Sequence, residues 1–253
     1  MLPEWIIDFL SETAVALLIW GLAVLFPFRP MAANEEFRWD LVAVAAVTAF
    51  GVVSSSGLFL FFGFLIDFVD RWFELIEHWS TESLVLAYVL FADFTAYWAH
   101  RLLHSKILWH SHAFHHSPRH LYVLSGSRAS FVHILVLFTG PTFGLILFPV
   151  YEVPAAFFFV VWLQILNQHI IHSDLKVPFP RQLEFVFVTP RFHFVHHSAD
   201  RHLSNNNFGF IFSIWDRLFG TYVHPETVNE DQPLGLDYAN SNLRLLIGLP
   251  PAK

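Results

Sequence analysis

The sequence predicts an all-α integral-membrane helical bundle of about four to five transmembrane helices, with a cytoplasmic helical cap. Two observations support this fold class. Of the 253 residues, 55% are hydrophobic and only 14% are charged, a composition too apolar for an ordinary soluble domain. Long apolar runs also recur along the chain, each close to the length of a bilayer-spanning helix.

Five apolar runs approach the roughly 20 residues that a spanning helix requires. In chain order they are Ile6–Phe28, Leu41–Ile66, Leu84–Ala99, Phe131–Val150 and Val153–Ile171. The first run carries Glu4, Asp8 and Glu12 where a cleavable signal would carry basic residues. We therefore expect the first run to be a retained helix.

The second run is the least regular. The segment Ser54–Gly57 interrupts it, so a kinked or re-entrant segment is the alternative to a fifth span. The following segment, Asp67–Trp79, is acidic and aromatic at helical spacing. This pattern favours a helix that lies along the membrane interface.

The basic residues set the orientation. With five spans, nearly all Lys and Arg fall on one side and Arg71 alone falls on the other, so the positive-inside rule makes the first side cytoplasmic. The Pro149–Pro154 connection predicts a hairpin that turns at the outer face. We expect an integral membrane protein with its site on the cytoplasmic side; a bacterial inner membrane is favoured, and the endoplasmic reticulum is the alternative.

Histidine motifs on that side are typical of a metal site. Eight of the histidines form an HxxxH pair and two HxxHH clusters about eighty residues apart, and a ninth follows the last apolar run. They are His100 and His104; His112, His115 and His116; His193, His196 and His197; and His172. Imidazoles at i, i+3 and i+4 share one helix face, so each cluster is expected to aim three nitrogens at one point.

The number of histidines suggests two metal ions. The chain has no cysteine, so a metal here must use His, Asp, Glu or water. A single zinc ion takes four ligands, whereas nine or ten imidazoles are enough for two ions with open positions. The ligand type alone does not choose among Zn, Cu, Fe and Ni.

The remaining histidines have ordinary interpretations. His169 lies three residues before His172, and it is either a tenth ligand or a residue one turn away from the site. The others are expected to be solvated side chains: His78, His110, His120, His133, His202 and His224.

Acidic residues near the motifs are candidates for orienting the histidines. Asp93 lies seven residues before His100 on the same helix face, with Tyr97 between them. A carboxylate in such an apolar run is costly unless it is paired or functional. We expect Asp93 to orient a cluster histidine, with a helix cap or an interhelix hydrogen bond as the alternative.

A second group of polar residues follows the last cluster. Asp216 is expected to act like Asp93, with an exposed environment beside Arg217 as the alternative. Asn207 and Gly209 are expected to shape a turn near the site.

The order, spacing and flanking residues of these motifs match a known family. The matching stretches are Asp93–His104, Leu108–Pro118, Gln168 with His172, Thr189–Ser198, Asn207–Gly209 and Trp215–Tyr222. From about Ala92 to Tyr222 the chain resembles the fatty acid hydroxylase/sterol desaturase superfamily of integral-membrane di-iron oxygenases. The resemblance implies that the nine histidines are iron ligands. Gln168 stands where some relatives have a histidine, so His169, a water or Gln168 itself takes that place.

The resemblance also implies a function. It implies an O2-dependent oxidoreductase that hydroxylates or desaturates a membrane lipid, whether a sterol, a fatty acyl chain, an ether lipid or an aminolipid. The cofactors implied are two iron ions, with zinc as the substitute in a purified sample, and O2 is the co-substrate. Electrons would come from a separate protein, either cytochrome b5-like or a ferredoxin/reductase.

Two other functions stay open at this point. A membrane-embedded zinc hydrolase would use metal-bound hydroxide, although the chain has no HExxH motif. A non-catalytic metal-binding or transport protein would instead place polar residues at mid-membrane depth. The net charge of −7 and the lack of a Lys/Arg run argue against nucleic acid as a partner.

We interpret the chain as one membrane domain with a catalytic cap. Residues 1–82 would hold the N-terminal transmembrane helices and the interfacial segment, residues 83–224 the catalytic part, and residues 225–253 a cytoplasmic tail.

Overall fold

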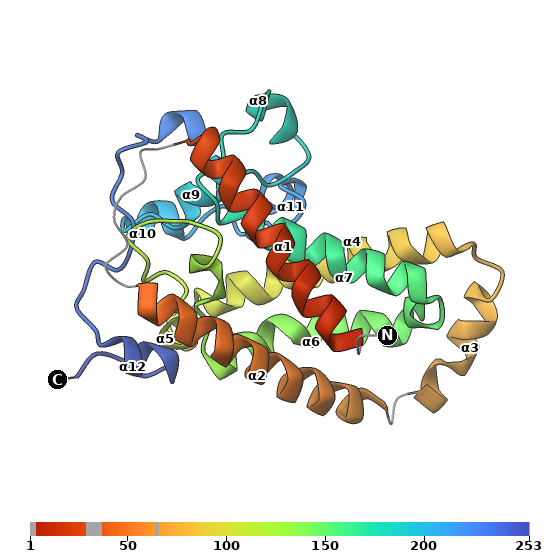
Figure 1. The fold of residues 1–253 in the computed structure, drawn as a ribbon. Helices are drawn as coiled ribbons and strands as arrows, with labels where there is room; N and C mark the ends of the chain where they lie inside the picture. The colour runs from red at the N-terminus through yellow and green to blue at the C-terminus, as the bar shows by residue number, and fades with distance from the viewer. Residues whose placement is uncertain (1–3, 29–36, 64–65, 253) are drawn as a thin grey trace.

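The computed structural model describes residues 4–28, 37–63 and 66–252, and within these residues the protein has helices and three isolated β-bridges but no strand. Most of the long helices lie alongside one another, the N-terminal helix crosses them at an angle, and the short helices gather mainly at one end (Figure 1). The longer helices are α1 (Glu4–Leu25), α2 (Phe37–Gly63), α3 (Ile66–Ile76), α4 (Thr81–Leu103), α6 (Phe131–Leu147) and α7 (Pro154–Ile171).

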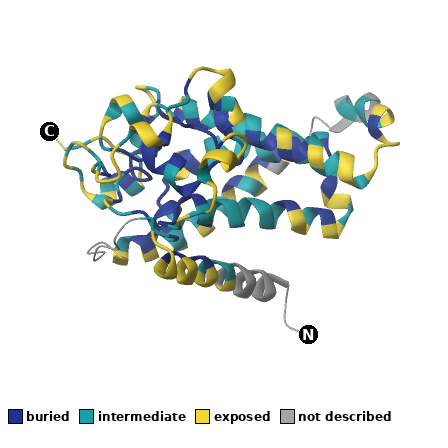
Figure 2. Ribbon diagram, turned by 90° about the horizontal axis from the view of Figure 1, so that it is seen from above, coloured by how far each residue is buried: buried dark blue, intermediate teal, exposed yellow. Residues whose placement is uncertain are grey.

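The short helices at that end are here called the cap, and its cytoplasmic location stays a prediction. They are α5 (Trp109–His112), α8 (Pro180–Leu183), α9 (Pro190–His196), α10 (Arg201–Ser204), α11 (Ile214–Leu218) and α12 (Asn242–Leu246), with 3-10 turns η1 (Ser125–Ser127) and η3 (Pro225–Thr227). A further 3-10 turn, η2 (Val150–Glu152), joins α6 to α7 at the other end of the bundle. Dark-blue buried residues concentrate where the cap meets the long helices (Figure 2).

Each of the five predicted apolar runs is a helix whose ends lie within about one turn of the predicted ends. Helix α2 continues through Ser54–Gly57, so this segment does not interrupt the helix. Two helices in the described part of the chain, α2 and α7, are long and apolar enough to cross a membrane, and Ala14–Leu25 and Phe131–Leu147 are shorter apolar helices. The number of spans and their orientation stay predictions.

Some side chains used in those predictions lie outside the described residues. These are Glu4, Asp8, Glu12, Asp67, Arg29 and Arg71. Helix α3 corresponds to the predicted interfacial segment, and the indole N–H of Trp72 donates to the carbonyl of Leu147 at 2.8 Å. This hydrogen bond attaches α3 to the end of α6 that lies away from the cap.

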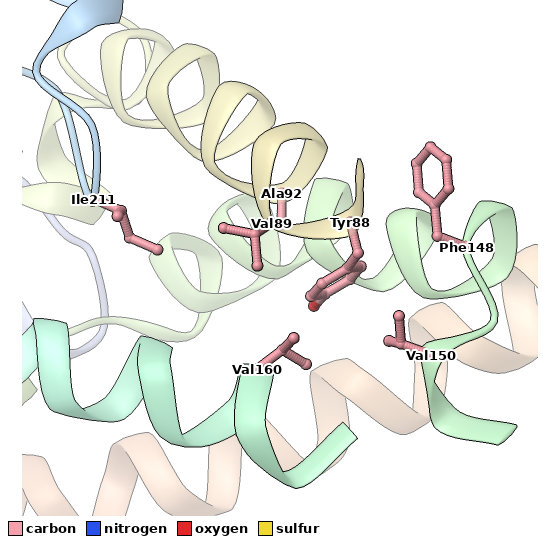
Figure 3. Packing of buried hydrophobic residues seen from close by; sticks show 7 residues of the cluster. All are labelled: Tyr88, Val89, Ala92, Phe148, Val150, Val160 and Ile211. Atoms are coloured by element: carbon pink, nitrogen blue, oxygen red, sulfur yellow. The ribbon is translucent and has the colours of Figure 1, made fainter. Parts of the chain in front are cut away.

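The main apolar core joins α4 to both helices of the hairpin. Tyr88, Val89 and Ala92 of α4 pack against residues of η2, α7 and the cap; Figure 3 shows the cluster of Tyr88, Val89, Ala92, Phe148, Val150, Val160 and Ile211. Burying one such aliphatic or aromatic side chain stabilises the fold by about 1.5–3 kcal/mol. This core fixes the position of α4, which carries His100.

Helices α4 and α6 approach closely at a glycine. A Cβ at Gly140 would lie 2.2 Å from the hydroxyl oxygen of Thr95, so no larger residue fits there without a shift. Small residues at helix contacts allow such close packing.

A buried ion pair attaches α2 to the cap. The guanidinium of Arg128 donates to Asp40 at 2.5 Å, and the hydroxyl of Tyr122 donates to the same carboxylate at 2.6 Å. Arg128 also donates to Ser117, the residue after His116, at 2.9 Å. Breaking a buried pair of this kind costs about 3–5 kcal/mol, so this contact firmly positions the segment that follows the first HxxHH cluster.

Candidate metal centre

Nine buried histidines converge where the cap meets the bundle, and they form two neighbouring groups. Within each group, one ring nitrogen from every residue lies within 4.8 Å of the others. The five-histidine group is His100, His104, His112, His116 and His196, and the four-histidine group is His115, His172, His193 and His197. The groups adjoin, since the rings of His116 and His197 stack with centroids 4.6 Å apart.

Helix ends place several of these histidines. His104 is the C-cap of α4, His172 the C-cap of α7, and His197 the C-cap of α9. Helix α9 begins with Thr189 as N-cap and Pro190 in its first turn, both favourable for starting a helix. The bundle therefore brings histidines far apart in the sequence to one level.

Each HxxHH cluster contributes to both groups, so the expectation that a cluster aims three nitrogens at one point is wrong. His115 and His116 belong to different groups, and so do His196 and His197. The physical reason is that consecutive residues of a helix point about 100° apart, whereas residues four apart share a face. His193 and His197 accordingly stay together.

The Nε2 atoms of several histidines face one another. The Nε2 atom of His100 lies 3.2 Å from that of His112, and the Nε2 atom of His104 lies 3.1 Å from that of His116. In the four-histidine group, His172 and His193 have Nε2 atoms 3.0 Å apart. Nitrogens bound about 2.0–2.1 Å from one metal at angles between square and tetrahedral would lie about 2.8–3.4 Å apart.

The Nδ1 partners define which nitrogen carries the proton. The Nδ1 atoms of His100, His172 and His196 donate to the carbonyls of Phe208, Gln168 and Asn206 at 2.9, 2.9 and 2.8 Å. A carbonyl only accepts, so a neutral ring keeps a lone pair on Nε2. The Nε2 of His196 is buried without a hydrogen-bond partner, which normally costs about 1–3 kcal/mol. A cation would remove that cost, so the donor set fits a metal.

The histidines are held neutral, as metal ligands must be. Burial, and then the neighbouring histidines, lower the pKa of His104, His112, His115, His116, His193, His196 and His197 well below the usual value. Burial also lowers the pKa of His172 to about 3.

One loop supports three members of the five-histidine group. The carbonyls of Phe208 and Asn206 accept from His100 and His196. The side-chain oxygen of Asn205 lies 3.2 Å from Nδ1 of His104. Asn207 has a φ of 56°, in the left-handed region that asparagine tolerates. Its side chain accepts from the amide of Val223 at 2.8 Å and donates to the carbonyl of Val223 at 3.0 Å. The expected turn at Asn207 is therefore present, and sequence reasoning missed the contacts that Asn205, Asn206 and Phe208 make with the histidines.

Asp216 fastens this loop. Its carboxylate accepts from the amides of Phe208 and Gly209 at 2.8 and 2.7 Å and from the hydroxyl of Thr221 at 2.7 Å. Asp216 is buried, so the exposed alternative is wrong. Burial raises the pKa of Asp216 to about 6, against the opposing effect of these hydrogen bonds. The hydroxyl of Tyr97 lies 2.8 Å from that of Thr221, which places Tyr97 in the same network.

Asp93 does not contact a histidine. Its carboxylate accepts from the amides of Ile211 and Phe212 at 2.7 and 3.0 Å and from the indole N–H of Trp215 at 2.8 Å. The expectation that Asp93 orients a cluster histidine is wrong, and the alternative of a hydrogen bond between segments holds. Asp93 joins α4 to the α11 region.

His169 lies outside both groups. Its Nδ1 atom lies 3.4 Å from the carbonyl of Val123. Gln168 meets His172 through its backbone carbonyl, while its side chain donates to the carbonyl of Gly126 at 3.0 Å. The neighbouring Gly126 is required here, because a Cβ on it would lie 2.6 Å from the ring of His172.

Two histidines expected to be solvated are instead largely buried. His133 is 3% exposed, and its Nδ1 atom lies 3.3 Å from Nδ1 of His112. His120 lies 3.4 Å from Asp174. A histidine at the start of an apolar run was the only sequence signal for His133. The side chains of His78, His202 and His224 are exposed as expected, and His110 is half-buried.

Comparison with known proteins agrees with the motifs. The sequence model of a family described as "Fatty acid hydroxylase" matches residues 85–221, more than half of the chain. An ornithine lipid hydroxylase, OlsE, of Rhizobium tropici is 31% identical over 59% of this chain and 44% of its own length. Human alkylglycerol monooxygenase is 31% identical over 63% of this chain and 34% of its own. Lathosterol oxidase of Rattus norvegicus is 27% identical over 66% of this chain and 52% of its own.

The matched part thus spans from about a third to about half of these relatives. No solved structure matches the chain. The family match covers α4 to the Thr221 turn and includes all nine histidines. The chain therefore belongs to the fatty acid hydroxylase/sterol desaturase superfamily.

Proposed function

We propose that this protein is an O2-dependent di-iron oxidoreductase that hydroxylates or desaturates a membrane lipid. The observation that carries the proposal is the pair of adjacent, buried, carboxylate-free histidine groups. His100, His104, His112, His116 and His196 would hold one ion, and His115, His172, His193 and His197 the other. Iron in these positions would supply the electron-transfer chemistry that activates O2.

The protein's own part in this reaction is to orient the ligands and exclude water. The carbonyls of Phe208, Asn206 and Gln168 fix three ring orientations. Burial keeps the imidazoles neutral and available as ligands. Hydroxylation consumes O2, a pair of electrons and a pair of protons and yields an alcohol and water, so an external donor protein is required, either cytochrome b5-like or a ferredoxin/reductase.

The names of the relatives support a lipid substrate. They refer to an ornithine lipid, an alkylglycerol and lathosterol, and each carries a hydroxylase, monooxygenase or oxidase activity. The apolar helices α2 and α7 support a membrane setting. We propose that the metal centre lies on the cytoplasmic side, because the predicted spans put nearly all basic residues on the same side of the membrane as the histidines.

A zinc hydrolase is less well supported. Such an enzyme usually has a carboxylate base near the metal-bound water, and neither histidine group contains an acid among the described residues. Asp93 and Asp216 are each occupied by three hydrogen-bond donors.

The function is tested with the purified protein loaded with ferrous iron and supplied with a reductase and mixed membrane lipids. Under air we expect lipid products that have gained one oxygen or lost two hydrogens by mass spectrometry. Under argon these products should be absent, and equal product without O2 would overturn the oxygenase proposal. Zinc-loaded protein is the matched control and should be inactive in both gases.

A further inference from the structure

The cap exposes a group of large apolar side chains next to α11, here named the cap wedge. Phe185 is 70% exposed and Leu218 is 64% exposed. The members of the cap wedge are Phe185, Val186, Phe187, Ile214, Leu218 and Phe219. Solvent-exposed apolar patches of this kind are uncommon on soluble proteins and usually mark a contact surface.

The two segments of the cap wedge are joined to each other. The amide of Ser213 donates to the carbonyl of Val186 at 2.9 Å, and the rings of Phe187 and Phe212 lie with centroids 5.7 Å apart. The guanidinium of Arg217 lies 5.4 Å from the ring centre of Phe185. The two segments that carry the exposed side chains are therefore held against each other.

Contacts with α4 and α7 give the depth of this surface along the bundle. The ring of Phe94 in α4 lies 5.2 Å from that of Trp215, and the ring of Trp98 lies 4.9 Å from that of Phe219. The side chain of Asn167 in α7 donates to the carbonyl of Phe210 at 2.7 Å.

These contacts lie inside the apolar runs, not beyond them. Phe94 is five residues before the end of the run Leu84–Ala99, which corresponds to about 7–8 Å along a helix. Asn167 is about one turn before the end of α7, a helix long and apolar enough to cross a membrane. The cap wedge is thus level with the last turns of helices expected to lie in lipid.

We propose that the cap wedge inserts into the boundary between the headgroups and acyl chains of the bilayer. Its depth favours lipid over a protein partner. Arg217 fits the edge of such a surface, because its guanidinium lies against aromatic rings, 3.7 Å from the ring centre of Tyr222 and 5.4 Å from that of Phe185. The cap is then partly embedded, and Asp216 connects the embedded α11 to the loop that orients His100.

The absence of cysteine from the sequence allows a direct test. Single variants Phe185→Cys and Leu218→Cys are labelled with a nitroxide in metal-free protein, reconstituted in vesicles of phosphatidylcholine and phosphatidylglycerol. Glu230→Cys, on an exposed polar part of the cap, is the aqueous control. Leu60→Cys on α2, where the native side chain is 80% exposed, is the lipid control. Ile214→Cys replaces either wedge variant that folds poorly.

The readout is the collision rate of each nitroxide with O2, which concentrates in lipid, and with a water-soluble nickel chelate. We expect the wedge labels to report a depth of about 5–10 Å below the headgroups, as for an interfacial helix. Wedge labels as accessible to nickel as the Glu230→Cys label would overturn the proposal and would indicate a protein-docking face. The measurement needs neither iron nor turnover, so its outcome is separate from that of the proposed function.

Discussion

Asp216 and His100 hydrogen-bond to opposite ends of the same peptide group. The N–H of Gly209 donates to Asp216 at 2.7 Å, and the carbonyl of Phe208 in that peptide accepts from Nδ1 of His100 at 2.9 Å. A buried carboxylate thus fixes a candidate metal ligand more than one hundred residues away through one rigid plane. The contact explains why an acid is buried so close to the histidines without touching them.

The variant Asp216→Asn should weaken metal binding. An amide replaces one acceptor oxygen by a donor that faces other donors, which releases the Phe208–Gly209 peptide and with it His100. Loss of such an orienting contact typically lowers metal affinity about 10–100-fold. Competition with a chelator measures the affinity of each ion.

The matched control is Asp93→Asn, since Asp93 also accepts three hydrogen bonds but contacts no histidine. We expect it to lower the free energy of unfolding by about 1–3 kcal/mol while metal affinity stays unchanged. Equal loss of metal affinity in both variants would contradict the role given to Asp216.

Gly126→Ala should disturb the four-histidine group. The added methyl group would lie 2.6 Å from the His172 ring and 2.9 Å from the Gln168 side chain, so His172 must move. We expect the variant to retain about one ion instead of two, measured by elemental analysis of purified protein. Gly57→Ala is the control, because a Cβ there meets nothing within 4 Å; a similar loss in that variant would show that the effect is not local.

His169 and His172, three residues apart in the sequence, should differ in their effect on metal content. His172→Ala removes a member of the four-histidine group, and its loss should reduce the bound iron. His169→Ala should keep the full metal content, because His169 lies outside both groups. Iron per chain, together with thermal melting to verify folding, distinguishes the two. A lower iron content in His169→Ala would mean that this residue does serve as a ligand.

The metal-free protein should lose stability as the pH falls. The pKa of His172 is about 3 in the folded protein and about 6.5 in an unfolded chain. Burial lowers the pKa of His193 and His197 in the same direction. Between these values the unfolded state binds more protons, so stability is present above about pH 6.5 and is lost towards pH 3. Thermal unfolding at several pH values measures this loss. Bound metal should move the loss to lower pH, and a melting temperature independent of pH below 6.5 would contradict the neutral, buried histidines.

Much of the fold could be predicted from the sequence because apolar runs are a local signal. The five predicted runs correspond to α1, α2, α4, α6 and α7, and the predicted ends differ from the observed helix ends by about one turn or less. Helix ends depend on caps such as Ser80 and Ser130, whose side chains accept from the amides of Ser83 and His133. The hydrophobic pattern does not contain that information.

The histidines of the centre could also be identified from the sequence, but their arrangement could not. Spacing within one cluster suggested one point of convergence, whereas the division into two groups depends on partners such as His104 and His196, which lie far apart in the sequence. The contact of His133 with His112 and the peptide between Asp216 and His100 are likewise long-range. Such contacts follow from packing and not from a local pattern.

The most direct test of the central claim is Mössbauer spectroscopy of the full chain loaded with iron-57, together with iron and protein quantification. We expect two irons per chain, one for each histidine group, as a magnetically coupled pair. The double variant His193→Ala with His197→Ala should leave a single, uncoupled iron. One iron per chain in the unmodified protein, or two irons without magnetic coupling, would contradict the account.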